Sequence, residues 1–98
     1  MKSEADVKKA IKKILVDAHA WYFMPVQTGY GAMGIPDFIV CHRGMFIGIE
    51  AKFGKNKESA WQKKQGTSIT EAEGVYLVIN EKTVDTLAAT LAAYTELI

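Results

Sequence analysis

The chain has 98 residues, of which 49% are hydrophobic, and its 12 basic and 11 acidic side chains leave a formal net charge of +1 at pH 7. This length and apolar content predict one domain over residues 1–98, and they exclude an intrinsically disordered chain and a membrane span of ~18 apolar residues. A charge so close to zero gives no whole-molecule argument for a nucleic-acid or membrane partner.

Residues 1–26 predict a helix and then a strand. Apolar side chains recur at three- and four-residue spacing over residues 3–18, which is typical of an amphipathic helix with Ser3 as its N-cap. Residues 21–26 are mostly aromatic or β-branched and predict a strand. Because Pro25 has no amide proton, we expect this strand to lie at an edge of the sheet or to end early.

Glycine recurs in residues 27–35, which are expected to form a loop. Residues 29–34 read Gly-Tyr-Gly-Ala-Met-Gly, a formal match to the G-x-G-x-x-G fingerprint of dinucleotide-binding proteins. That fingerprint needs a strand before it and a helix after it, whereas here Pro36 opens a strand. We therefore expect no nucleotide cofactor, and we interpret the segment as a flexible loop whose main chain can approach another molecule.

The rest of the chain predicts three more strands and two helices. Residues 38–41 and 45–51 are apolar strands separated by a turn of hairpin length. A helix is expected over 60–72, a strand over 75–79 and a helix over 84–94. The continuous apolar run of 75–79 predicts a central strand that is buried on both faces. The order α-β-β-β-α-β-α predicts an α/β fold with a mixed sheet of about four strands and helices on both sides.

Charge is distributed unevenly along the chain. Residues 43–66 carry six basic and two acidic side chains, a sum of +4, whereas 67–98 carry five acidic and one basic, a sum of −4. Solvated helix faces are the usual explanation of such runs. Cys41 is the one cysteine, and the first residues lack the apolar stretch of a secretory signal. We therefore expect a protein of the reducing cytoplasm, that of the host if the chain is phage-encoded.

Two acidic residues and a lysine lie at the ends of the predicted hairpin strands. Asp37 begins one strand, and Glu50 and Lys52 end the other, where residues two apart project from the same face. If the strands pair, both carboxylates can converge at one edge of the sheet, which suits a hard divalent cation; the main-chain carbonyl of Ala51 is a further oxygen ligand. The alternatives are a turn residue at Asp37 and a cross-strand ion pair between Glu50 and Lys52.

A divalent cation at this position has a clear chemical use. It would neutralise the charge that develops on a phosphodiester during an in-line displacement, and it would help to generate hydroxide. Lys52 would position or deprotonate the attacking water, or stabilise the developing negative charge. The residues thus favour metal-dependent hydrolysis of phosphodiesters.

Three segments together resemble a known nuclease family. Residues 34–40 (GIPDFIV), 49–54 (IEAKFG) and 59–62 (SAWQ) are similar to the VRR-NUC family of the PD-(D/E)xK nuclease superfamily, and the resemblance covers essentially the whole chain. It implies a restriction-endonuclease-like core and hydrolysis of DNA that depends on Mg²⁺ or Mn²⁺.

The resemblance also implies roles for individual residues. Asp37 and Glu50 correspond to metal ligands, and Lys52 corresponds to the catalytic lysine. The chain departs from the family pattern at Ala51, where a β-branched residue is common, and at Gln65, where an aromatic residue is often found. Because only the main chain of Ala51 would bind metal, its departure matters little, while Gln65 belongs either to the core or to the edge of the active site.

Two further polar residues have a structural and a functional interpretation. The S-x-x-Q pattern from Ser59 to Gln62 indicates a capping box, whereas the resemblance directs Gln62 to the metal-bound water or phosphate; both roles are compatible. Glu4 resembles an acid that many members of the superfamily place near the metal, and it is equally suited to the N-terminal dipole of the first helix.

The basic segment contains candidate contacts to DNA. Lys55, Lys57, Lys63 and Lys64 follow the predicted site and suit sequence-independent contacts to phosphates, although solvated surface positions explain half of them. Tyr30 in the glycine-rich loop is suited to stacking on a base or wedging into a junction, and equally to packing within the loop.

Small stand-alone members of the family look like homodimeric resolvases of four-way junctions. We therefore expect a structure-selective endonuclease for branched DNA that acts as a C2 homodimer, with residues 21–24 or the last helix in the interface. The alternatives are a nuclease directed at DNA ends or flaps and a catalytically silent nucleic-acid-binding module.

Overall fold

The computed structural model describes residues 1–27 and 31–96, which form four strands, three α-helices and one short 3₁₀ helix. In chain order these are α1 (Glu4–Asp17), β1 (Trp21–Phe23), β2 (Phe38–His42), β3 (Met45–Ala51), α2 (Ala60–Glu71), β4 (Val75–Ile79), η1 (Val84–Thr86) and α3 (Leu87–Glu96). The predicted α/β class and the order α-β-β-β-α-β-α are confirmed.

The four strands form one mixed sheet in the order β1-β2-β3-β4. The first two pairings are antiparallel, and β4 runs parallel to β3. The hairpin register places Phe38 opposite Ile49. Asp37 and Glu50 therefore come next in register, at the end of the hairpin away from its turn.

The position of β4 differs from the sequence prediction. It is an edge strand that pairs with β3, and only Ile79 among its five residues is buried. The central strands are β2 and β3. The apolar run of β4 reflects its position between two helical layers, because Leu77 packs on the main core while Tyr76 faces α2.

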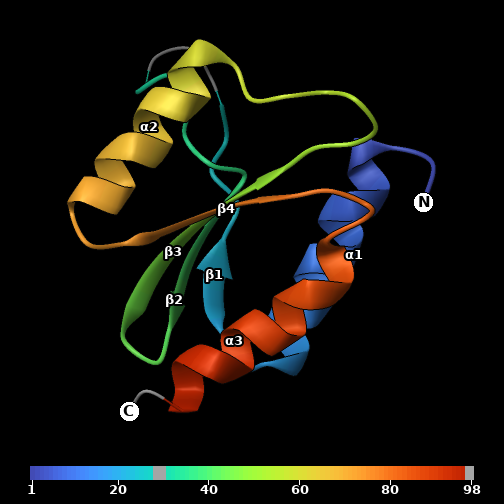
Figure 1. The fold of residues 1–98 in the computed structure, drawn as a ribbon, viewed down its shortest axis with the longest axis vertical. Helices are drawn as coiled ribbons and strands as arrows, with labels where there is room; N and C mark the ends of the chain where they lie inside the picture. Colours follow the sequence, from blue (N-terminus) through green and yellow to red (C-terminus); the bar gives the residue numbers. More distant parts are fainter. Residues whose placement is uncertain (28–30, 97–98) are drawn as a thin grey trace.

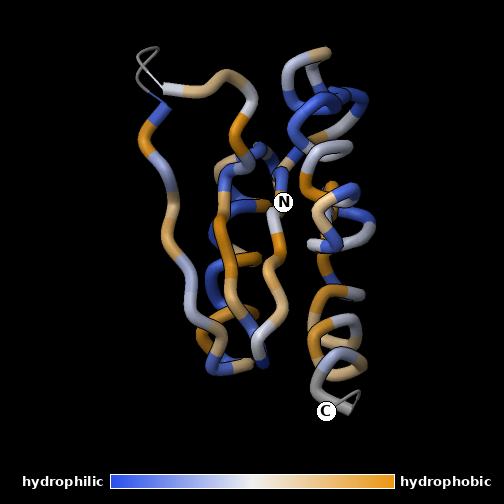
Figure 2. Tube along the Cα trace, turned by 90° about the vertical axis from the view of Figure 1, so that its left-hand side faces the viewer, coloured by the Kyte–Doolittle hydropathy of each residue, from blue (hydrophilic) through white to orange (hydrophobic). Residues whose placement is uncertain are grey.

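The main core lies on one face of the sheet, where α1 and α3 pack against β2 and β3. Figure 1 shows these two helices together on the side of the sheet away from α2. Alternation along each strand directs every second side chain into this layer. The fully or nearly fully buried apolar residues are Val7, Ile11, Leu15, Phe38, Val40, Ile47, Ile49, Ala51, Ile79, Val84, Leu87 and Leu91. The strands contain mostly apolar residues, whereas the helices contain both apolar and polar residues (Figure 2).

The opposite face is covered by α2 over β3 and β4. A Cβ atom on Gly66 would lie 2.5 Å from the ring of Tyr76, so this glycine allows the helix to approach the strand closely. The edge strand β1 is not covered in this way, and the side chains of Trp21 and Phe23 are 60% and 48% exposed. Tyr22 points to the other face and packs against Phe38.

Several element ends differ from the predictions. The strand predicted over 21–26 ends at Phe23, the early end that Pro25 indicated. The helix predicted over 84–94 begins as the single 3₁₀ turn η1 and becomes α-helical at Leu87. Ser3 caps α1 as predicted, because its hydroxyl accepts the Asp6 amide. Among the described residues, no helix is long and apolar enough to cross a membrane.

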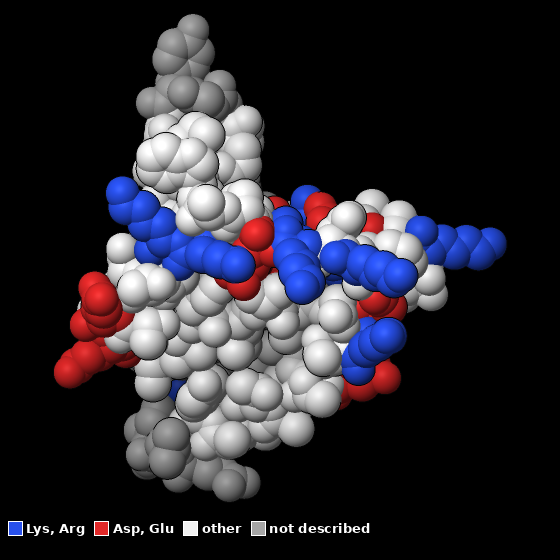
Figure 3. Space-filling model, turned by 45° about the horizontal axis from the view of Figure 1, so that its top comes forward, with Lys and Arg blue, Asp and Glu red and all other residues white. Residues whose placement is uncertain are grey.

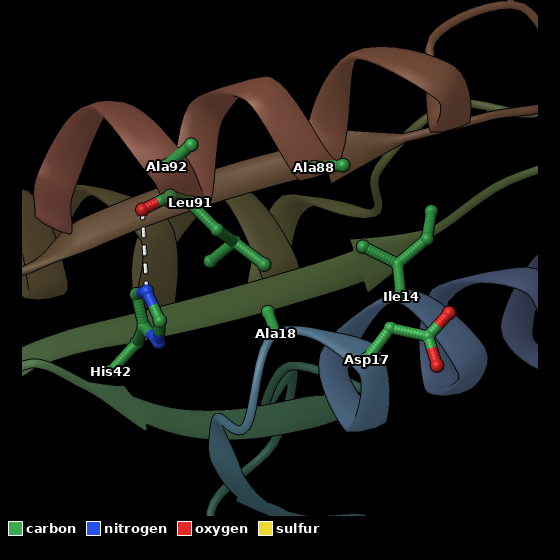
Figure 4. A pocket seen from close by; sticks show the side chains of 7 residues that line it. All are labelled: Ile14, Asp17, Ala18, His42, Ala88, Leu91 and Ala92. Atoms are coloured by element: carbon green, nitrogen blue, oxygen red, sulfur yellow. Dashed lines mark hydrogen bonds between the residues drawn. The ribbon is translucent and has the colours of Figure 1, made fainter.

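An apolar cavity of about 480 Å³ lies between α1, α3 and the end of β2. Figure 4 shows His42 at its wall, with Nε2 3.2 Å from the Leu91 carbonyl oxygen. The other lining residues are Ile14, Asp17, Ala18, Ala88 and Ala92. His42 and Asp37 are at opposite ends of β2, roughly 16 Å apart along an extended strand. The cavity is therefore separate from the acidic residues at the start of β2.

Candidate metal-dependent active site

Asp37 and Glu50 lie beside each other at the ends of β2 and β3. The Asp37 side chain is bound to the end of β3, because its Oδ2 accepts the main-chain amide of Ala51 at 2.8 Å. Glu50 projects toward α2 and is only 2% exposed. The structure thus brings together Asp37 and Glu50, the two acids predicted as metal ligands. It also hydrogen-bonds Asp37 to the main chain of Ala51, whose carbonyl is the predicted third ligand.

The Glu50 carboxyl group is buried with one oxygen satisfied and one not. Its Oε1 accepts a hydrogen bond from Gln62 Nε2 at 3.0 Å, whereas its Oε2 is buried without a hydrogen-bond partner. Burial is the main cause that raises the pKa of Glu50 to about 8; the neighbouring Asp37 carboxylate adds to the rise, and the charge of Lys52 opposes it. Glu50 therefore holds a proton near neutral pH until a cation compensates its charge.

Gln62 combines the two roles that the sequence left compatible. The main-chain N–H of Gln62 donates to the Ser59 hydroxyl, and the side-chain Oε1 of Gln62 accepts the main-chain N–H of Ser59. These two hydrogen bonds complete a capping box at the start of α2. The same side chain donates through Nε2 to Glu50. The cap thus fixes the side chain that holds Glu50 in place.

The glycine-rich segment approaches α2. Gly34 has a φ of +75°, and a Cβ atom there would lie 2.7 Å from the amide nitrogen of Gln62. Gln65 donates to the Met33 carbonyl at 3.0 Å and thereby ties the loop to the helix. At Gly34 the main chain of the loop thus approaches the protein's own helix, and the predicted approach to another molecule stays a prediction. Tyr30 lies outside the described residues.

Helix α1 contributes a charged pair to this site. The Lys8 ammonium lies 3.6 Å from Asp37 Oδ1 and 3.8 Å from Glu4 Oε2. The charge of Glu4 is the smallest of the causes that raise the pKa of Glu50. Glu4 also occupies the first turn of α1, so it can interact with the helix dipole and contribute to the charge of the site. Lys8 was missed in the sequence analysis, and its spacing of four residues from Glu4 was the available signal.

The proposed phosphate-binding lysines lie in the loop that follows β3 and near the start of α2. Lys52 is half-buried, whereas Lys55 and Lys57 are exposed in the loop after β3, and Lys63 and Lys64 are exposed on α2. Figure 3, which brings the upper end of Figure 1 forward, shows a row of basic side chains across this face with acidic groups between them. The near-zero net charge therefore coexists with a basic surface.

Two aromatic residues lie on α2 and on the strand beneath it. Trp61 is 49% exposed, and the centroid of its ring lies 5.3 Å from Lys64 Nζ. The buried side of α2 is formed instead around Gly66, which packs on Tyr76. Tyr76 donates its hydroxyl to Glu58 at 2.7 Å, and burial raises its pKa. No motif in the sequence indicates this pair.

The donor set fits a hard divalent cation. Mg²⁺ typically binds one or two carboxylates and retains several waters, so Asp37, Glu50 and the Ala51 carbonyl are sufficient. The unpartnered Oε2 of Glu50 is the structural feature that a cation would satisfy. Over residues 1–27 and 31–96, no group of three or more His, Cys, Asp or Glu side chains forms a ready metal cluster. A site here would therefore be rich in water.

The chain was also compared with known proteins. No protein-family model matches it, and no curated protein shows a significant match. The case for a function therefore depends on the geometry above and on the motifs.

The raised pKa of Glu50 predicts a pH-dependent stability for the metal-free protein. Because the folded state holds a proton between the ordinary pKa of 4.5 and about 8, its free energy of unfolding should fall as pH rises through this interval. The slope contributed by one proton is at most about 1.4 kcal/mol per pH unit. Urea unfolding in EDTA measures it, and Glu50→Gln should remove it. Parallel pH profiles of the two proteins would contradict the prediction.

Proposed function

We propose that this protein is a DNA endonuclease that depends on a divalent metal and has a restriction-endonuclease-like core of the VRR-NUC type. The observation that carries the proposal is the pairing of Asp37 with Glu50, whose buried Oε2 has no hydrogen-bond partner. The charge of Lys52 acts on the same carboxyl group. Two acids and a lysine at the end of a hairpin suit this chemistry, because carboxylates bind the metal and an ammonium can stabilise negative charge on the phosphate.

The residues of the site have distinct roles in the proposed reaction. Asp37, Glu50 and the Ala51 carbonyl would hold Mg²⁺ or Mn²⁺, which supplies charge neutralisation at the scissile phosphate and lowers the pKa of bound water. The Lys52 ammonium stabilises negative charge on the phosphate or orients the attacking water. Gln62 keeps Glu50 in position from the capped end of α2.

The basic surface supports DNA as the substrate. The loop after β3 and the start of α2 expose Lys55, Lys57, Lys63 and Lys64, which can bind phosphates without regard to sequence. This binding should weaken steeply with salt, because each neutralised phosphate releases counterions. Tyr30 remains a proposed base contact of the glycine-rich loop.

We further propose that the substrate is branched DNA, in particular a four-way junction, cut by a homodimer. Paired cuts in a symmetric junction require two active sites related by a two-fold axis. The exposed aromatic side chains of the edge strand β1, Trp21 and Phe23, support this strand as the contact between two copies. Helix α3 is the alternative contact surface.

A substrate panel tests the proposed function. Purified protein is incubated with labelled four-way junction, flap, linear duplex and single-stranded DNA, each with Mg²⁺, Mn²⁺ or EDTA, beside Lys52→Ala. We expect symmetric paired nicks in the junction with either metal, none in EDTA, and strong loss in the variant. If the protein cuts only flaps or DNA ends, those structures, and not the four-way junction, are its substrates. Binding without cleavage would identify a silent module, and the nuclease proposal would then be wrong.

A further inference from the structure

Lys8 is the one basic side chain that the structure places in ionic contact with the acids of the site, among the described residues. Its ammonium lies between Asp37 and Glu4, at 3.6 and 3.8 Å. The other lysine of α1 with an ionic contact, Lys13, pairs with Asp17 near the end of the helix, where both side chains are largely exposed. Lys8 is only 34% exposed and Asp37 only 16%, so their pair is less screened by solvent.

The two contacts are ionic in length and lack the short distance of a strong charge-assisted hydrogen bond. The ammonium therefore neutralises Asp37 without a fixed hydrogen-bond geometry. A divalent cation bound by Asp37 and Glu50 would be repelled by a positive charge this close to one of its ligands. The ammonium and the metal thus compete for the same negative charge.

We propose that Lys8 is a built-in counter-cation that neutralises Asp37 and Glu4 in the metal-free protein and that a divalent metal must displace from Asp37. This inference rests on the metal site of the proposed function. It makes Lys8 a positioning residue, because it acts through the carboxylates and has no part in the hydrolysis. Its displacement also frees the Glu4 carboxylate, which can then turn toward the metal or its waters.

The consequences for metal affinity and for stability have opposite signs. Without the ammonium, Asp37 keeps its full negative charge for the metal, so affinity should rise. In EDTA, the same change leaves Asp37 and Glu4 without the ammonium that lies between them, so the protein should melt at a lower temperature. A merely structural lysine would lower the melting temperature without tightening metal binding.

The test compares Lys8→Met with Lys12→Met, an exposed position one turn further along the same helix. Methionine retains an unbranched stem of similar length and removes the charge. Calorimetric titration of Mn²⁺ in low salt, without DNA, should give about tenfold tighter binding for Lys8→Met and wild-type binding for Lys12→Met. Thermal unfolding in EDTA should show a lower melting temperature for Lys8→Met alone. Lys8→Arg, which retains the charge, should match the wild type.

The outcomes separate this inference from the proposed function. If wild-type protein binds Mn²⁺ and Asp37→Asn does not, the metal site stands, and equal affinities of wild type and Lys8→Met then overturn the role of Lys8 alone. If no variant binds Mn²⁺, the metal site and the counter-cation are both wrong. Should Lys8→Met fail to fold, Lys8→Gln replaces it in the same comparison, with the same expected gain.

Discussion

Asp37→Asn or Glu50→Gln is expected to reduce the rate of metal-dependent DNA cleavage by about a thousandfold or more, which corresponds to about 4 kcal/mol in the barrier. Each change removes one carboxylate from a site that has only two. Steady-state cleavage of the preferred DNA substrate with Mg²⁺ measures the loss.

Both substitutions are chosen so that the fold survives. The amide oxygen introduced by Asp37→Asn can still accept the Ala51 N–H, and the group introduced by Glu50→Gln can still accept the Gln62 amide. Since Glu50 is protonated near neutral pH in the metal-free protein, its neutral replacement should leave the melting temperature in EDTA unchanged or higher. Glu71→Gln, at an exposed glutamate of α2, is the control and should cleave normally. Wild-type rates in either site variant would exclude these residues as metal ligands.

Gly34→Ala is expected to cause the largest loss of stability among single additions of a methyl group. Its φ of +75° costs an L-residue about 1–2 kcal/mol, and the added Cβ would meet the main chain of Trp61 and Gln62, which costs about 1–3 kcal/mol more. The helix start must then move, so the Gln62–Glu50 hydrogen bond should also be lost. Urea unfolding should show a loss of about 3–4 kcal/mol.

Gly44→Ala separates the two causes of this loss. Gly44 has a φ of +83°, but nothing lies within 4 Å of a Cβ atom built there. It should therefore show only the cost of the backbone conformation, about 1–2 kcal/mol. If both variants lose the same stability, the contact of the loop with α2 does not hold the site together.

Much of the candidate site could be predicted because its parts are local in the sequence. A hairpin with a short turn fixes its own register, so the turn between β2 and β3 already determines that Asp37 and Glu50 meet. The S-x-x-Q spacing likewise determines the capping box from Ser59 to Gln62. Neither required knowledge of how distant segments pack.

The errors concern relations between segments that are far apart. The apolar run 75–79 indicated burial, but only the sheet order shows that its second neighbour is missing and that it is an edge strand. Helix α2 turns the side with Gly66 toward the sheet and leaves Trp61 49% exposed, which no motif in the sequence indicated. Lys8 was one of several lysines on a polar helix face until the helix was placed over Asp37.

The sequence by itself determined the element order, the hairpin register and the two acids with Lys52 at its end, because hydrophobic periodicity and turn length act over neighbouring residues. Tertiary structure alone decided that α1 brings Lys8 and Glu4 to Asp37, and that α2 brings Gln62 to Glu50. The physical reason is that a helix can pack at many angles and offsets with similar burial of its apolar face. The distribution of charge can also be compared between the sequence and the fold. The sequence already showed a basic run over residues 43–66, and the fold shows a row of basic side chains across one face with acidic groups between them (Figure 3).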